Sequence, residues 1–126
     1  MRSNRIILIL LFSFTLTADN LLANYAFKKK VKDVCKSYRI PLESSQMLLD
    51  DEEVGITMES GRNNFEMYML VGFASAGQAI AHQKQMGLSN AYLPVTVSVS
   101  VLVPVSKGEF NTFVADCSSE MAISLA

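Results

Sequence analysis

The sequence has few of the residues on which most catalytic and metal sites depend. Its 126 residues include one histidine and two cysteines. None of the G-x-S-x-G, H-E-x-x-H or phosphate-loop motifs occurs in it. Two thiols and one imidazole are too few soft ligands for a zinc site, so we expect neither a metal ion nor a cofactor. Any Ser–His or Cys–His mechanism would have to use His82.

The apolar run near the N-terminus is also too short to cross a bilayer. Residues 6–16 are apolar except for Ser13 and Thr15. As a helix they rise only about 17 Å, against about 30 Å for the hydrocarbon core. Two arginines precede this run, and the small residues Ala18 and Ala23 follow it. This is the pattern of a secretory signal peptide. We predict that residues 1–18 or 1–23 are removed and that the protein is periplasmic or secreted.

Positive charge is scarce outside one segment. Residues 24–39 hold six basic side chains and one acidic one, whereas residues 40–126 hold three basic and ten acidic ones. The excess of acidic residues over 40–126 argues against nucleic acid as a partner. The basic segment also has an apolar stripe at helical spacing, which predicts an amphipathic helix over 25–39. Such a helix either docks on its own domain or contacts an anionic membrane surface. Its stripe consists of Phe27, Val31, Val34, Cys35 and Tyr38.

Residues 92–105 have the clearest strand pattern in the chain. Every second residue from Val95 to Val105 is valine, and Thr96, Ser98 and Ser100 occupy the alternate positions. Successive strand side chains point to opposite faces, so one face is apolar and the other is hydroxylated. The hydroxylated face either meets solvent or binds a ligand. Other elements must cover the valine face.

Two interpretations remain open for residues 65–87. They form one long helix ending at Gly87, or a strand over 65–73 followed by a helix from about Ser75. The good helix formers and the lack of β-branched residues other than Val71 before residue 74 favour the long helix. Shorter patterns predict strands over 54–59 and 110–116.

These elements together predict an α+β two-layer fold. An antiparallel sheet of 54–59, 92–105 and 110–116 is covered by helices over 25–39 and about 65–87. Residues 24–126 form a single domain.

Two smaller features occur between the predicted elements. Ser44 or Ser45 could cap a short helical turn over 46–49. Residues 50–53 are four consecutive acids, whereas calcium loops space their ligands around a glycine, so we interpret them as a solvated turn.

Cys35 and Cys117 are predicted to form a disulfide, because an exported chain with an even cysteine count favours one. The alternative is two separate buried thiols. Asp116, Cys117 and Ser118 form a reactive-looking polar cluster, although a strand end followed by a helix cap explains them equally well. Ser118 or Ser119 would be that cap.

The leading functional hypothesis is a non-catalytic exported binding or interaction module. The alternative is a small exported hydrolase or redox enzyme that uses His82 or the Asp116–Cys117–Ser118 cluster. An enzyme should bring His82 beside a nucleophile or a carboxylate.

A protein partner or self-association is expected, with a homodimer as the specific prediction. Met67, Leu70 and Val71 lie on the side of the predicted helix that its own sheet does not cover. The long 92–105 strand also outruns its predicted neighbours and would expose an edge.

Overall fold

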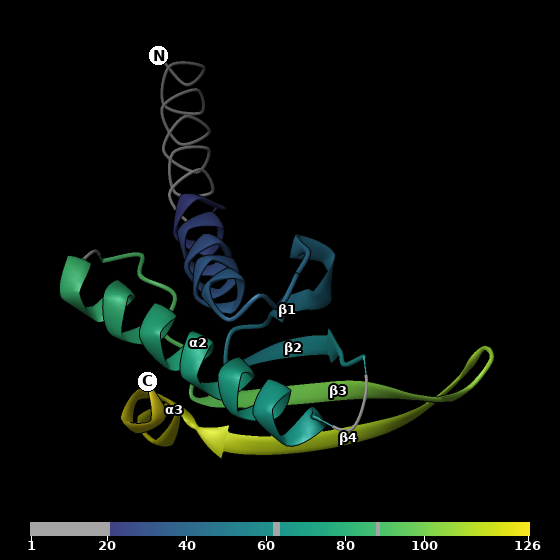
Figure 1. Cartoon of the computed structure of the whole chain (residues 1–126). Coiled ribbons are helices and arrows are strands. Elements are labelled where there is room, and N and C mark those ends of the chain that lie inside the picture. The colour runs from purple at the N-terminus through teal and green to yellow at the C-terminus, as the bar shows by residue number, and fades with distance from the viewer. Residues whose placement is uncertain (1–20, 62–63, 88) are drawn as a thin grey trace, which may run out of the picture.

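A four-stranded sheet carries its helices on one face (Figure 1). The structure, a computed structural model, describes residues 21–61, 64–87 and 89–126. The predicted signal segment 1–18 lies outside these residues. The alternative cleavage point after Ala23 lies inside them.

The strands follow the order β1-β2-β3-β4 across the sheet. They are β1 (Met47–Leu49), β2 (Glu53–Glu59), β3 (Thr96–Ser106) and β4 (Glu109–Ser118). The predicted α+β two-layer fold is confirmed. The sheet is mixed rather than wholly antiparallel, because β2 and β3 run parallel while β1–β2 and β3–β4 are antiparallel.

The parallel pair follows from the long helix α2 (Phe65–Met86), which joins β2 to β3. The helix returns the chain to the end of the sheet where β2 began, so Glu53 lies beside Thr96. Parallel neighbours require a crossover of this kind. The single-helix interpretation is therefore confirmed and the strand over 65–73 is wrong. Gly87 ends the helix in the left-handed region, with φ of 61°.

The valine face of β3 forms the centre of the core, as predicted. Val97, Val99 and Val101 are completely buried. Val95 and Val105, at the two ends, are 65% and 53% exposed. Val95 precedes the first residue of β3, and Val105 lies near the hairpin end of the strand. The core face of β2 faces the same layer through Val54, Ile56 and Met58.

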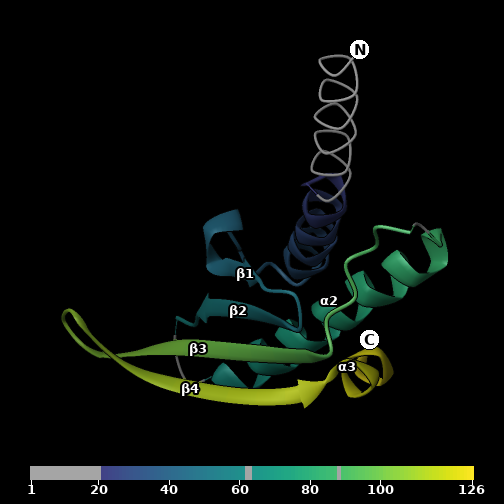
Figure 2. The ribbon, with the colours of Figure 1, turned by 180° about the vertical axis from the view of Figure 1, so that it is seen from behind.

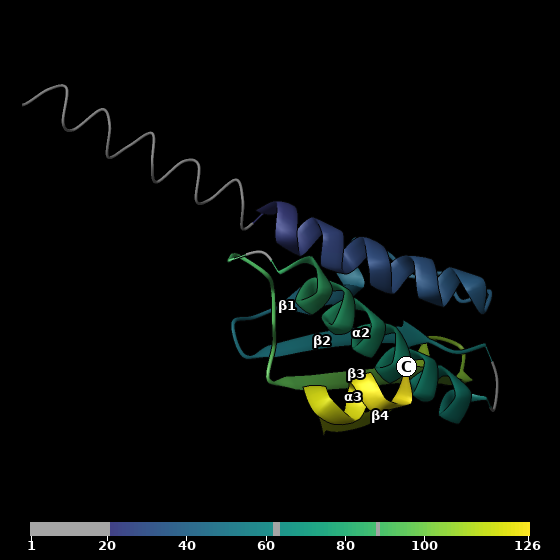
Figure 3. The same cartoon turned by 90° about the vertical axis from the view of Figure 1, so that its left-hand side faces the viewer.

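Two glycines allow α2 to approach its neighbours closely. A Cβ atom on Gly72 would lie 2.8 Å from Val99 Cγ1 on β3, and one on Gly77 would lie 1.9 Å from the carbonyl oxygen of Ala122. Ala122 belongs to α3 (Ser119–Leu125). In Figure 3, α2 lies between the first helix and α3.

The first helix covers residues 21–37 of the described chain and packs on its own domain. Phe27, Val31 and Cys35 are fully buried, so most of its apolar stripe is unavailable to a membrane; Tyr38, past the helix end, is 54% exposed. Arg39 ends the helix with a φ of 61°. Its N–H donates to the Lys36 carbonyl, and the Ile40 N–H donates to the Cys35 carbonyl, which satisfies the last carbonyls of the helix.

The helical turn predicted over 46–49 is wrong, because only residues Ser44–Gln46 form a 3₁₀ turn before β1. Met47 is buried and Leu48 is exposed, so the strand alternation decides this segment. The cap predicted at Ser118 is confirmed, since its Oγ accepts a hydrogen bond from the Met121 N–H at 3.1 Å.

Gly77→Ala should destabilise the protein by about 2–3 kcal/mol, because the added methyl overlaps backbone atoms of α3 that cannot move alone. Gly55→Ala is the matched control, since its nearest neighbour would be 4.0 Å away. Urea denaturation of the two variants measures the difference. Equal stability would contradict the close approach of α2 and α3.

Candidate functional site

The Asp116–Cys117–Ser118 cluster is divided by the sheet. In the β3–β4 register, Asp116 pairs with Ser98 and Cys117 pairs with the buried Val97. Successive strand residues face opposite sides, so the Asp116 carboxylate and the Cys117 thiol point away from each other. Ser118 is occupied as the cap of α3. Residues adjacent in the sequence therefore do not form a joint site.

The thiol of Cys117 is not activated as a nucleophile. Its partial burial raises its pKa, the Asp116 carboxylate raises it further, and a backbone hydrogen bond from Ala122 opposes both. A reactive cysteine needs the opposite shift, because the thiolate is the attacking form.

His82 lies on α2 and is partly buried, not on a solvated polar face. Its Nδ1 atom is buried and has no hydrogen-bond partner among the described residues. Among the described residues, no hydrogen bond or ion pair joins it to Asp116 or Cys117. The arrangement that an enzyme of this kind requires, with His82 hydrogen-bonded to a nucleophile or a carboxylate, is therefore not formed there.

The two cysteines are free thiols and do not lie at disulfide distance. Cys35 is buried, and its thiol interacts with Ser75 on α2. Cys117 lies on β4, near Ala122 of α3. The prediction of a Cys35–Cys117 disulfide disagrees with this arrangement, because the two thiols are not within bonding distance of each other. Burial raises the pKa of Cys35 as well, against a smaller lowering by Ser75.

The sheet face opposite the helices is not covered by another element of the described chain (Figure 2). The strand registers place Thr57, Ser100 and Val114 in one row across three strands, and Gly55, Ser98 and Asp116 in the next. We call this surface the open sheet face. Its members in the middle of the two central strands are half-buried, whereas Glu53 and Glu59 at the ends of β2 and the members on β1 and β4 are exposed. It comprises Leu48, Glu53, Gly55, Thr57, Glu59, Thr96, Ser98, Ser100, Leu102, Phe110, Thr112, Val114 and Asp116.

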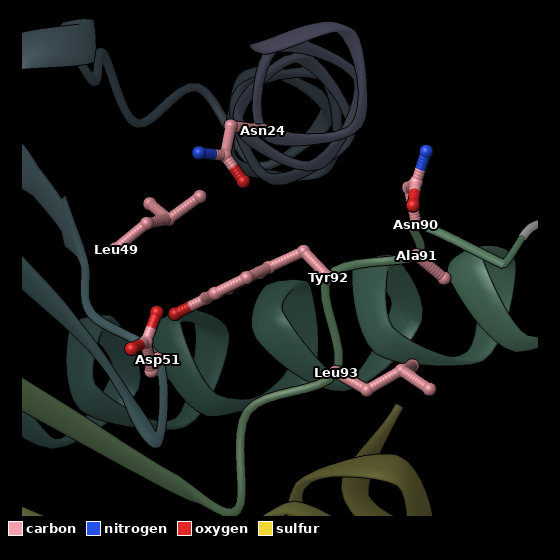
Figure 4. Close-up of a pocket in the computed structure, with 7 residues that line it drawn as sticks. All are labelled: Asn24, Leu49, Asp51, Asn90, Ala91, Tyr92 and Leu93. Carbon is pink, nitrogen blue, oxygen red and sulfur yellow. The ribbon is translucent and has the colours of Figure 1, made fainter. Parts of the chain in front are cut away.

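A second feature is a shallow recess of about 360 Å³ between the first helix, the acidic turn and the segment before β3 (Figure 4). Asn24, Asp51 and Asn90 supply its polar lining, and Tyr92 crosses it towards Asp51. The acidic residues 50–53 are exposed, as expected of a solvated turn. Within the described ranges, no group of three or more histidine, cysteine or acidic side chains could hold a metal ion.

Tyr92 uses its hydroxyl for structure rather than chemistry. The hydroxyl lies 2.6 Å from the Asp50 carbonyl oxygen and 3.2 Å from that of Glu53, so its proton is shared between them. Its ring meets Phe27 edge-on, with the ring centroids 4.9 Å apart. Burial raises the pKa of Tyr92, and the nearby carboxylates of the acidic turn raise it further. The phenol therefore stays protonated at neutral pH and links the acidic turn to the segment before β3.

Gln83 joins three segments from a completely buried position on α2. Its Nε2 donates to the Ala23 carbonyl at 2.9 Å, and its Oε1 accepts from the Tyr92 N–H at 3.0 Å. Gln83 was not singled out in the sequence analysis. The signal was present, because a glutamine in a buried stripe must find partners for both ends of its amide.

Comparison with protein-family models, with curated proteins and with solved structures found no match for this chain. Of the helices in the described ranges, none is both long enough and apolar enough to cross a membrane.

Tyr92→Phe should lower the free energy of unfolding by about 1 kcal/mol at neutral pH, because the acidic turn loses its donor. The difference from wild type should shrink above about pH 10, the ordinary pKa of tyrosine. In that range the unfolded phenol ionises first, whereas the folded one keeps its proton, so wild-type stability falls as pH rises. Urea titrations at several pH values measure this. Tyr25→Phe, at a 67% exposed position, is the control, and a difference that does not depend on pH would contradict the role of Tyr92.

Gln83→Met should cost about 1–3 kcal/mol, although the side chains are similar in size, because the Ala23 carbonyl and the Tyr92 N–H lose their partner. Gln85→Met, an exposed position on the same helix, is the matched control. Thermal unfolding of both variants provides the measurement. A Gln83→Met protein as stable as wild type would show that the amide contributes no net stability.

Proposed function

We propose that this protein is an exported, non-catalytic binding module that holds a protein partner on the open sheet face. The observation that carries the proposal is the bare face itself: the helices of the described chain lie on the other side of the sheet (Figures 1 and 2). The apolar run and small residues at the N-terminus support export.

The shape of the open sheet face favours a macromolecule. Small-molecule sites are concave and enclose most of their ligand, whereas this surface extends across the four strands of the sheet. Hydroxyls of Thr57, Ser98 and Ser100 offer donors and acceptors in register at its centre. Val114 and Phe110 add exposed apolar area, at 60% and 51%. Apolar contacts with interspersed hydrogen bonds are typical of protein interfaces.

Charge indicates the chemistry of the partner. Glu53, Glu59 and Asp116 are exposed around the open sheet face. No lysine or arginine occurs in β2, β3 or β4. A partner with basic residues around its own contact surface would be electrostatically complementary, and its association rate would fall as salt rises.

Ser100→Arg tests the proposal, because it places a long side chain at the centre of the open sheet face. Tagged protein is incubated with the exported fraction of its source cells, and the captured proteins are quantified by mass spectrometry. Ser100→Arg should reduce the capture of a specific partner by at least about tenfold, as expected for an obstructed interface centre. Ser45→Arg adds the same charge at an exposed site outside this face and should capture as wild type does.

Equal capture by both variants would overturn the proposed surface. The enzyme alternative is tested separately with His82→Ala and Cys117→Ser in hydrolase and thiol-exchange assays. An activity of the wild type that disappears in either variant would replace the proposal, provided circular dichroism shows that the variant is folded.

A further inference from the structure

β4 forms a free edge of the sheet. It pairs with β3 on one side, and within the described chain no strand pairs with its other side. Residues 109–114 are all exposed. Half of the backbone N–H and C=O groups of such a strand point outward and can pair with another strand.

This edge lacks the features that normally prevent pairing. Residues 110–115 contain no charged residue, no proline and no glycine. The one irregularity in the β3–β4 register lies between Pro104 and Ser106, on β3 near the hairpin tip. The opposite edge is different, since β1 has only three residues and is followed directly by the acidic turn. Natural edge strands are protected by charges, prolines, bulges or short length.

The first residues of β4, next to the hairpin, also have few neighbours in their own chain. β2 accompanies β3 only as far as Leu102, so beyond that point β3 and β4 continue as a two-stranded ribbon that projects past the helices (Figure 1). A two-stranded ribbon is marginal by itself in water. Val105 and Phe110 on this ribbon are 53% and 51% exposed.

We propose that two copies of the chain pair antiparallel through the outer edges of β4, around a two-fold axis at Phe113. In this register Thr112 lies opposite Val114 of the partner subunit, and the projecting ribbon of each copy runs along the supported half of β4 in the other. The two sheets become one, and the ribbon gains a third strand.

Side chains near the axis suit this register. Phe113 is 38% exposed and stacks on Phe65 of α2, with ring centroids 4.2 Å apart. Met67 and Leu70, in the adjacent turns of α2, are 46% and 53% exposed. The axis places these apolar groups beside the Phe113 of the partner subunit, and aromatic cross-strand pairs stabilise antiparallel strands.

Charges also permit the pairing. Glu109 would face Cys117 of the partner subunit, and Asp116 would face Phe110 of the partner subunit, so no acidic residue opposes another. Glu109 and Asp116 differ in parity along β4, so they lie on opposite faces of the sheet. The pairing does not depend on the proposed partner of the open sheet face.

The test uses charge at the two facing positions. Full-length wild type, measured by size-exclusion chromatography with light scattering at about 100 μM, should have twice the mass that denaturing mass spectrometry gives for the same sample. T112K/V114K places lysines opposite each other on both sides of the axis and should raise the dimer Kd by at least about tenfold. T112E/V114E should do the same. An equimolar mixture of the two variants should dimerise again, because each lysine then faces a glutamate.

S45K/L48K, which adds the same charge at and near the β1 edge, is the control and should remain dimeric. A wild type that is monomeric at this concentration overturns the proposal, as does a lysine variant that stays dimeric or a mixture that does not pair. A monomer that binds a strand of another protein at β4 would also overturn the assignment of a second copy.

Hydrogen exchange of the wild type covers the case in which the variants do not fold. Amides of residues 110–115 that point outward should exchange more slowly at high protein concentration than at low concentration. Exchange that does not change with concentration overturns the proposal.

Discussion

The fold depends on how closely α2 packs against β3. Gly72 gives Val99 the space to approach the helix backbone, and this contact covers the centre of the valine face. The same helix is the connection that makes β2 and β3 parallel, so its packing sets both the core and the strand order. Gly77 extends the close contact to α3. A bulkier residue at either glycine would separate layers that the rest of the chain cannot bring together.

Around this apolar centre, two buried or partly buried polar side chains hold the irregular segments. Gln83 links the first helix to the segment before β3, and Tyr92 links that segment to the acidic turn. Ser119 adds a third link, because its hydroxyl donates to the Pro94 carbonyl and its N–H to the Val95 carbonyl. These side chains satisfy backbone groups outside the regular elements, which explains why buried polar residues occur here.

The two faces of the sheet therefore differ in how far the described chain covers them. On the helical side, side chains are used for packing. On the other side, the open sheet face and the β4 edge present unused hydrogen-bonding groups together with apolar side chains such as Val114. The proposed partner contact and the proposed self-association use different parts of this side, one the face and the other the edge. Pairing at β4 would join two open sheet faces into one wider surface.

The sequence by itself determined the elements whose pattern is local: the alternating strand β3, the amphipathic first helix and a serine cap at residue 118 or 119. It also favoured the long helix α2 over a strand at residues 65–73. Periodicity and capping act within a few residues and can be read without partners. It did not determine the parallel pairing of β2 and β3, the strand at Met47–Leu49, the free thiols or the role of Gln83. Those features depend on which distant segments meet. Asp116 and Cys117 are the clearest case. They are adjacent in the chain, but their side chains lie on opposite faces of the sheet because β4 pairs with β3.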